Sequence, residues 1–219
     1  MNADAVSNHD VNDTTVAFFD FDGTLTIGDT LMPFLKFVVG KPKYYWNLLL
    51  VMPVLVCYFF KLIRNDVAKE VVLKRYLAGY HIDELFALGE RFSKEIIPTM
   101  LRPEGMERLS WHQDQGHVCV IVSASLDIWL RPWANINSFD SIITTKLEIK
   151  ENIVTGRISG FNCYGQEKVN RINSFLKSRN PEKSYAYGDT KGDSYMLKYV
   201  DSGWMINKSK ENNYWTETK

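Results

Sequence analysis

The sequence predicts an α/β protein with a doubly wound, Rossmann-like parallel sheet as its core and an inserted all-helical cap. Short apolar runs alternate with amphipathic stretches along most of the chain, which is typical of parallel strands joined by crossover helices. Residues 41–101 differ, because they contain several helical patterns and no convincing strand. We therefore predict a core domain of residues 16–40 and 102–206, with a helical cap subdomain at 41–101.

The first predicted strand, residues 16–19, consists of Val, Ala and two Phe and reads as buried. A loop follows, and Asp29 or Thr30 can cap a helix that runs to Val39, where Gly40 and Pro42 end it. In the cap, apolar residues recur at helical spacing over 66–77 and 82–97.

The second half of the chain returns to alternating strands and helices. In order, we predict a helix at 103–115, a strand at 118–122, a helix that Pro132 should kink or end, a strand from Ile142, a hairpin of 147–150 and 153–157, a helix at 167–176, a strand at 184–187, a helix at 191–199 and a last strand at 204–206. The polar ends, 1–15 and 207–219, read as mobile tails.

Composition narrows the class of function. Lys plus Arg and Asp plus Glu each number 26 in 219 residues, so no overall positive charge points to nucleic acid. Three cysteines are an odd number without metal-ligand spacing, which favours a reducing compartment such as the cytoplasm. The four histidines show no metal-binding pattern, and we expect them at the surface.

Two carboxylates, Asp20 and Asp22, follow the first strand at alternate positions and precede Gly23, which permits a sharp turn. The carboxyl ends of parallel strands are where open α/β sheets place their chemistry. Two acids there can hold a hard cation and leave one carboxylate free to attack. Taken alone, Asp-x-Asp-Gly is equally typical of an ordinary acidic turn.

Three further features follow in a fixed order: Ser123 after the apolar run 118–122, Lys168 at the start of a helical pattern, and Gly-Asp-x-x-x-Asp at 188–193. Together with Asp-x-Asp-Gly-Thr-Leu at 20–25, this set resembles the haloacid dehalogenase superfamily of phosphatases. The resemblance covers about residues 16–206. The helical insert is similar to the small cap of the phosphoserine phosphatase branch, which closes over the site and excludes water.

The resemblance implies a role for each acidic residue. Asp20 is expected to be the nucleophile that forms an aspartyl-phosphate, and Asp22 to donate a proton to the leaving oxygen and later take one from water. The implied cofactor is Mg²⁺, held by Asp20, the backbone carbonyl of Asp22 and Asp189. Asp193 is expected to orient Asp189 or a bound water.

Phosphate binding is expected from Ser123, Lys168 and Gly23. Ser123 is predicted where a strand meets a helix N-terminus, whose backbone N–H groups bind anions. The Lys168 ammonium would balance the charge between Asp20 and the phosphoryl group. Without the other motifs, Ser123 would be a plain helix cap and Lys168 an exposed helix residue.

Residues 44–60 form a run of 17 residues without a charge, flanked by Lys41, Lys43, Lys61 and Arg64. As a helix, this run is about 25 Å long, short of a relaxed membrane crossing, and Pro53 interrupts it. A single crossing would also separate Asp20 from its partners. Either the run is covered inside the cap, or it is an interfacial or re-entrant helix, and we favour the membrane.

The substrate prediction depends on this run, on Asp29 and on residues 167–169. Phosphoserine phosphatases commonly carry a Glu seven residues after the second Asp, and here that position is Asp29, one methylene shorter. Asp29 and Glu-Lys-Val at 167–169, together with the apolar cap, resemble bacterial phosphatidylglycerophosphatases of the same superfamily. Arg75 is a further candidate for binding a substrate anion.

We therefore predict a Mg²⁺-dependent phosphomonoester phosphatase acting on a lipid phosphate such as phosphatidylglycerophosphate, at the inner face of the cytoplasmic membrane. The alternative keeps this chemistry but takes phosphoserine or another small soluble phosphate. A third hypothesis is a non-catalytic membrane-associated scaffold, which should show erosion of the polar set; no motif position is missing here.

Overall fold

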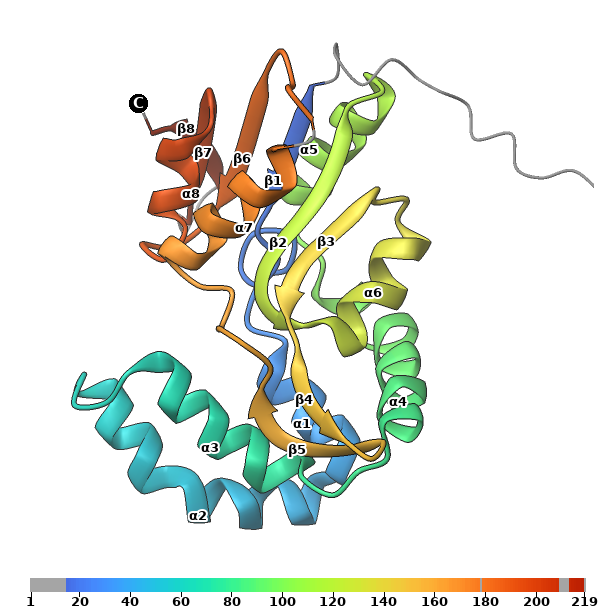
Figure 1. The fold of residues 1–219 in the computed structure, drawn as a ribbon, viewed down its shortest axis with the longest axis vertical. Helices are drawn as coiled ribbons and strands as arrows, with labels where there is room; N and C mark the ends of the chain where they lie inside the picture. Colours follow the sequence, from blue (N-terminus) through green and yellow to red (C-terminus); the bar gives the residue numbers. More distant parts are fainter. Residues whose placement is uncertain (1–14, 178, 209–212, 219) are drawn as a thin grey trace, which may run out of the picture.

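A computed structural model describes residues 15–177, 179–208 and 213–218. Its main sheet has six strands in the order β3-β2-β1-β6-β7-β8, and all neighbours are parallel except β7 and β8 (Figure 1). The strands of this sheet are β1 (Val16–Phe19), β2 (Val118–Leu126), β3 (Ser141–Thr145), β6 (Ser184–Gly188), β7 (Ser202–Asn207) and β8 (Tyr214–Glu217). The predicted α/β fold class is confirmed.

Strand β1 lies at the centre of the sheet, paired with β2 on one side and β6 on the other. Its four residues are fully buried and alternate between two hydrophobic cores: Ala17 and Phe19 in one, Val16 and Phe18 in the other. A continuous apolar run is what a strand covered on both faces requires. Helices α5 and α6 contribute to the first core, and α7 and α8 to the second.

The helices follow the predicted order closely. They are α1 (Leu31–Val39), α2 (Lys41–Phe59), α3 (Asn65–Leu77), α4 (Ile82–Glu95), a 3₁₀ turn at Ile97–Met100, α5 (Pro103–Asp114), α6 (Asp127–Ile136), α7 (Gln166–Leu176) and α8 (Ser194–Tyr199). Among the described residues, no helix is both long enough and apolar enough to cross a membrane.

The region predicted as an all-helical cap receives a β-hairpin from the core half of the chain. Strands β4 (Leu147–Lys150) and β5 (Ile153–Ile158) pair with each other and lie beside α3 (Figure 1). Gly156 has a positive φ of 79°, and a Cβ there would come within 2.3 Å of the Lys74 Cα, so only glycine permits this approach. The cap helices therefore pack with a hairpin that comes from a later part of the chain, residues 147–158.

Helix α4 packs against α6 of the core. Pro132 lies inside α6 and lacks the N–H that would bond to the carbonyl of Ile128. That carbonyl faces Gly89 of α4, where a Cβ would come within 2.3 Å of it. Of the two predicted outcomes, a kink or an end at Pro132, the end is wrong, because the helix continues to Ile136, and α4 covers the freed carbonyl.

Two other predictions were wrong. Residues 214–217, placed in a C-terminal tail, form β8, whose Trp215 packs on Tyr187 with ring centroids 5.2 Å apart. His112, expected at the surface, is fully buried and bonds through Nε2 to the Tyr187 hydroxyl at 2.8 Å. Residues 1–14 of the predicted tail at 1–15, and residues 209–212 and 219, lie outside the described part of the chain.

Candidate active site

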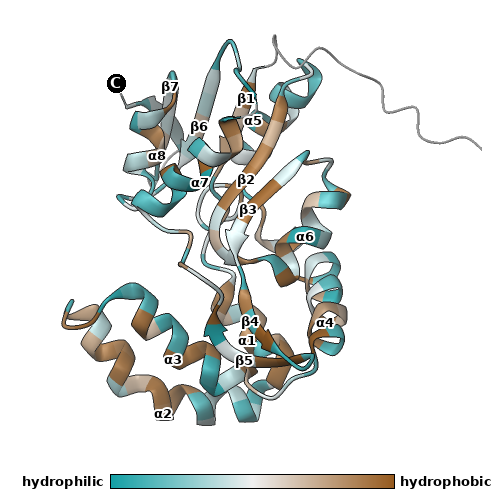
Figure 2. Cartoon of the chain, viewed as in Figure 1, coloured by the Kyte–Doolittle hydropathy of each residue, from teal (hydrophilic) through white to brown (hydrophobic). Residues whose placement is uncertain are grey.

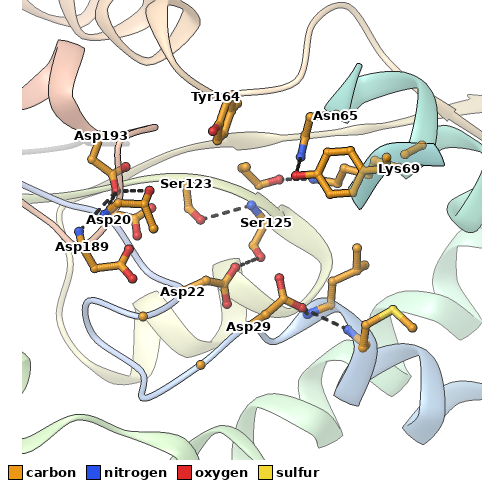
Figure 3. A pocket seen from close by; sticks show the side chains of 18 of the residues that line it. Asp20, Asp22, Asp29, Asn65, Lys69, Ser123, Ser125, Tyr164, Asp189 and Asp193 are labelled. Atoms are coloured by element: carbon orange, nitrogen blue, oxygen red, sulfur yellow. Dashed lines mark hydrogen bonds between the residues drawn. The ribbon is translucent and has the colours of Figure 1, made fainter. Parts of the chain in front are cut away.

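A cavity of about 540 Å³ lies between the carboxyl ends of the strands and the first three helices (Figure 3). Its wall includes Asp20, Asp22, Ser123, Lys168, Asp189 and Asp193 from the core. The opposite wall comes from α1, α2 and α3 and includes Leu31, Met32, Leu55, Tyr58, Lys69 and Val72. Four segments far apart in the sequence therefore meet at one site, as the order of the motifs predicted.

Asp20 lies directly after β1 and is almost fully buried. Its Oδ1 accepts a hydrogen bond from the Lys168 Nζ at 2.6 Å, and its Oδ2 accepts one from the Thr24 hydroxyl at 3.1 Å. Burial and the nearby Asp193 carboxylate raise the pKa of Asp20, while Lys168 acts in the opposite direction. The carboxylate is thus held in one orientation at the cavity wall.

Lys168, at the start of α7, is 2% exposed, which excludes an ordinary surface lysine. Its Nζ lies 2.6 Å from Asp20 and 2.7 Å from Asp193. Burial lowers the pKa of Lys168, but the two carboxylates outweigh burial and hold the pKa above its ordinary value. This ammonium therefore stays charged and balances the negative charge beside Asp20.

Asp193 shapes the loop that follows β6. Its Oδ2 accepts hydrogen bonds from the N–H of Asp189 at 3.2 Å and from the N–H and hydroxyl of Thr190, both at 3.0 Å. Its Oδ1 bonds to Lys168, so both oxygens of Asp193 have partners. In contrast, the Asp189 Oδ1 is buried and has no partner among the described residues, while its Oδ2 bonds to Lys208 at 2.7 Å.

The carboxylates fit a divalent cation. Asp20, Asp189 and Asp193 each offer an oxygen, and these three atoms lie within 4.8 Å of one another. The Asp189 Oδ1, without a partner among the residues that the structure describes, adds a buried acceptor that needs a cation or a donor. Hard carboxylate oxygens are the ligands that Mg²⁺ prefers. The Asp22 carboxylate is not part of this cluster.

Asp22 occupies a separate environment. Its Oδ1 accepts hydrogen bonds from the Thr30 N–H at 2.8 Å and from the Thr30 hydroxyl at 2.6 Å, and its Oδ2 accepts one from the Ser125 hydroxyl. Burial, and then the charge of Asp29, raise the pKa of Asp22 to about 6. Asp22 can therefore hold or release a proton near neutral pH, which suits a general acid and base.

Ser123 lines the cavity, but the local structure differs from the prediction. Strand β2 continues through Ser123 to Leu126, with an irregular register between them, and α6 begins only at Asp127. The Ser123 hydroxyl accepts a hydrogen bond from the Ser125 N–H at 3.1 Å. The expected helix N-terminus at Ser123 is therefore wrong, because the strand continues three residues further, to Leu126, before α6 begins.

Gly23 is required at its position for two reasons. Its φ is +86°, and a Cβ would come within 2.1 Å of the Asp189 Oδ2. The Gly23 carbonyl also accepts a hydrogen bond from the Nε of the buried Arg102 at 3.1 Å. Sequence reasoning missed Arg102, because a single arginine before a predicted helix carries no distinguishing signal.

The two predicted substrate-reading residues differ in position. Asp29 lines the cavity, and its Oδ1 accepts hydrogen bonds from the N–H groups of Leu31 at 3.0 Å and Met32 at 3.3 Å, so Asp29 caps α1. Arg75 is exposed on α3, donates to Asn47 at 2.9 Å and does not line the cavity. The structure therefore does not bring Arg75 to the site.

On the cap side of the cavity, the positively charged side chain is that of Lys69 of α3, whereas Arg75 was the predicted one. Its Nζ donates to the Ala124 carbonyl and, at 3.1 Å, to the Asn162 Oδ1. Burial lowers the pKa of Lys69 to about 8, and the charges of Asp22 and Asp29 oppose this. A lysine on an amphipathic helix is usually solvated, so its sequence position gave no signal.

Comparison with known proteins agrees with this geometry. The family model for haloacid dehalogenase-like hydrolases matches residues 17–198. Protein CicA of Caulobacter vibrioides is 32% identical over 194 residues, covering 88% of this chain and 86% of that protein. Phosphoserine phosphatase SerB1 of Mycobacterium tuberculosis is 26% identical over 202 residues, covering 89% of this chain and 65% of that protein.

Among solved structures, a Bordetella pertussis protein of unknown function superposes with a TM-score of 0.76 at 25% identity, covering 86% of this chain and 88% of that one. The region that the family model matches, residues 17–198, includes every motif whose residues line the core side of the cavity. By its sequence, its fold and the convergence of these motifs, the chain belongs to the haloacid dehalogenase-like hydrolases.

Proposed function

We propose that the protein is a Mg²⁺-dependent phosphatase of phosphate monoesters that acts through an aspartyl-phosphate on Asp20. The observation that carries this proposal is the contrast between its two motif carboxylates. Asp20 is fixed by Lys168 beside a cluster of cation-binding oxygens, whereas Asp22 lies apart with a pKa of about 6. One group is placed to attack and the other to exchange a proton.

In the proposed reaction, an Asp20 oxygen attacks the phosphorus while the bond between phosphorus and the leaving oxygen breaks. Protonated Asp22 gives its proton to the leaving oxygen. The Asp22 carboxylate then takes a proton from the water that attacks the aspartyl-phosphate, and phosphate leaves. Throughout these steps, Lys168 offsets negative charge at Asp20.

The cation would be held by Asp20 and Asp189, and by the backbone carbonyl of Asp22 that the family resemblance implies, with Asp193 orienting the Asp189 loop. A bound Mg²⁺ supplies charge neutralisation for the phosphoryl oxygens. The Asp189 Oδ1, which has no partner in the described part of the chain, supports this assignment, because a buried carboxylate oxygen without a donor is costly unless a cation satisfies it.

For the substrate, we propose a lipid phosphate, such as phosphatidylglycerophosphate, reached at the inner face of the cytoplasmic membrane. Helix α2 supports this proposal because apolar side chains line the cavity on one side of the helix and are exposed to solvent on the other. Leu55 and Tyr58 line the cavity, whereas Trp46, Leu49 and Phe59 are exposed at 61%, 62% and 79%. Figure 2 shows hydrophobic residues along α2, and lysines lie on both sides of the charge-free run 44–60.

A soluble substrate such as phosphoserine is the second candidate, and Asp29 favours it. Its carboxylate lies at the cavity wall, where it could face a substrate amine, and SerB1 is named a phosphoserine phosphatase. The capping bonds to Leu31 and Met32 use only one of its two oxygens.

A substrate panel separates these candidates. Initial rates of phosphate release with Mg²⁺ would be compared for phosphatidylglycerophosphate in detergent, phosphoserine and p-nitrophenyl phosphate. We expect kcat/KM for the lipid to exceed that for phosphoserine by at least about 10²-fold, since only the lipid buries acyl chains against α2. The reverse ranking would overturn the lipid assignment, and no release from any ester would overturn the phosphatase.

Membrane contact has its own test. Flotation with vesicles containing anionic lipid should carry the wild-type protein upward, and Phe59→Ser with Phe60→Ser should weaken this by about tenfold. Ile136→Ser on α6 is the matched control, because Ile136 is also exposed, at 56%, but lies away from α2. Wild-type protein that stays at the bottom of the gradient would contradict the membrane proposal.

A further inference from the structure

We propose that Lys208 is a positioning residue of the cation site: it holds one oxygen of Asp189, leaves the other to the cation, and sets the charge of the loaded site. This inference rests on the proposed Mg²⁺-dependent phosphatase. Lys208 follows β7, and no motif of the sequence analysis includes it.

The contact is asymmetric. The Lys208 Nζ lies 2.7 Å from the Asp189 Oδ2, and the side chain of Asp189 is 4% exposed while that of Lys208 is 47% exposed. The Asp189 Oδ1 is buried and has no partner among the described residues. With Oδ2 fixed by Lys208, the carboxylate cannot rotate freely, and Oδ1 is the oxygen available to a cation beside Asp20 and Asp193.

The space for this ion pair is made by Gly23. A Cβ at position 23 would come within 2.1 Å of the Asp189 Oδ2 and within 3.1 Å of the Lys208 Nζ. Any larger residue would therefore displace the pair. Gly23 in the first motif and Lys208, 185 positions later in the chain, thus both lie against the Asp189 carboxylate.

Lys208 adds a second positive charge to the carboxylate cluster that Lys168 already contacts. The three carboxylates of the cluster contact two ammonium groups, Lys168 at Asp20 and Asp193, and Lys208 at Asp189. With all five groups ionised, the cluster carries one negative charge, and a divalent cation makes it positive by one. Without Lys208, the cation-loaded cluster would be neutral, and its attraction for a phosphate dianion would fall.

Lys208 therefore weakens cation binding and strengthens binding of the phosphoryl anion once the cation is present. Removing the charge should move the two affinities in opposite directions. A residue that only stabilises the fold would move both in the same direction, or neither. This opposition is the signature of the proposed role.

The test compares Lys208→Met with the wild type by calorimetry at low ionic strength. For Lys208→Met, we expect Mg²⁺ alone to bind about threefold to tenfold tighter, and orthovanadate with saturating Mg²⁺ to bind weaker by a similar factor. Lys208→Arg should behave like the wild type. Lys198→Met removes the same charge from the exposed face of α8 and should change neither affinity.

Unchanged or weaker Mg²⁺ binding by Lys208→Met would overturn the inference, as would unchanged vanadate binding. Both effects should shrink as salt is added, because an exposed ammonium is screened. A wild-type protein that binds Mg²⁺ but hydrolyses no phosphate ester would refute the proposed function alone. The metal isotherms of the variants would still decide the role of Lys208.

Discussion

The cavity has two contrasting ends. At the core end, Asp20, Lys168 and Asp193 are almost fully buried and bonded to one another. At the cap end, Leu55, Tyr58 and other apolar side chains surround one cation, Lys69, which bonds only to uncharged oxygens among the described residues. The charged groups of the core end are thus fixed by hydrogen bonds, whereas the cap end is mostly apolar, and we expect the cap end to select the leaving group.

The largest effect should come from breaking the core end. Asp20→Asn removes the proposed nucleophile while keeping an amide oxygen that can accept from Lys168 and an amide N–H that can donate to the Thr24 hydroxyl. We expect kcat to fall by at least about 10³-fold for every substrate, measured as phosphate release. An unchanged melting temperature would show that the fold is intact. A variant with near wild-type turnover would refute Asp20 as the nucleophile.

Asp22→Asn should differ from Asp20→Asn because its effect on the rate should depend on the leaving group of the substrate. Alkyl phosphates need a proton on the leaving oxygen, so their hydrolysis should slow by about 10²- to 10⁴-fold. p-Nitrophenyl phosphate has a good leaving group, and its first step should be affected far less, as measured by the pre-steady-state burst. Equal losses for both esters would argue against a general acid at position 22.

The pH profile of the wild type follows from the same group. Because the pKa of Asp22 is about 6, the acid form is lost as pH rises through this value. We expect phosphorylation of Asp20 by alkyl phosphates to decline above about pH 6, with no such decline for p-nitrophenyl phosphate.

A smaller effect should come from the cap end. Lys69→Met should raise KM by about tenfold for esters with a second anionic group near the phosphoryl group, with little change in kcat. Since the pKa of Lys69 is about 8, the wild-type KM should rise above this pH, whereas that of the variant should not. Lys74→Met, on the exposed face of the same helix, is the control. Equal KM values in the wild type and Lys69→Met would remove Lys69 from substrate recognition.

The smallest effect concerns stability. Folding raises the pKa of Asp22 from its ordinary 3.8 to about 6, so the carboxylate is disfavoured in the folded state. The stability contributed by its protonated form is complete below about pH 4 and is lost as pH rises through 6. Asp22→Asn should therefore raise the melting temperature by a few degrees, roughly 2–4 °C, at pH 8 and hardly at pH 4. A lower melting temperature at pH 8 would contradict this.

The sequence predicted that Asp20, Ser123 and Asp189 lie together because each follows an apolar run that becomes a strand, whereas Lys168 lies at the start of α7. The apolar runs that become β1, β2 and β6 end at Asp20, Ser123 and Gly188, and parallel pairing brings these ends together. Three short buried strands are thus enough to predict which side chains converge. The fold class follows from the same alternation.

The cap end could not be predicted in this way. Helical periodicity identifies α2 and α3 but does not show which residue of each faces the cavity, so Arg75 was chosen and Lys69 was missed. The hairpin β4–β5 was recognised locally, yet nothing in its sequence indicates that it packs on α3. Strand β8 has only four residues, too few for a clear pattern, and it joins the sheet by pairing with β7.

The contact between Gly89 and the Ile128 carbonyl has a consequence for motion. Because Pro132 leaves that carbonyl without its helical partner, α4 is seated on α6 at a point where no larger side chain fits. We expect α4 to travel with the sheet, and any opening of the cavity to be a swing of α2 and α3 with their hairpin. The moving unit would then be shorter than the inserted segment, and Gly40, at positive φ between α1 and α2, would lie at one of its ends.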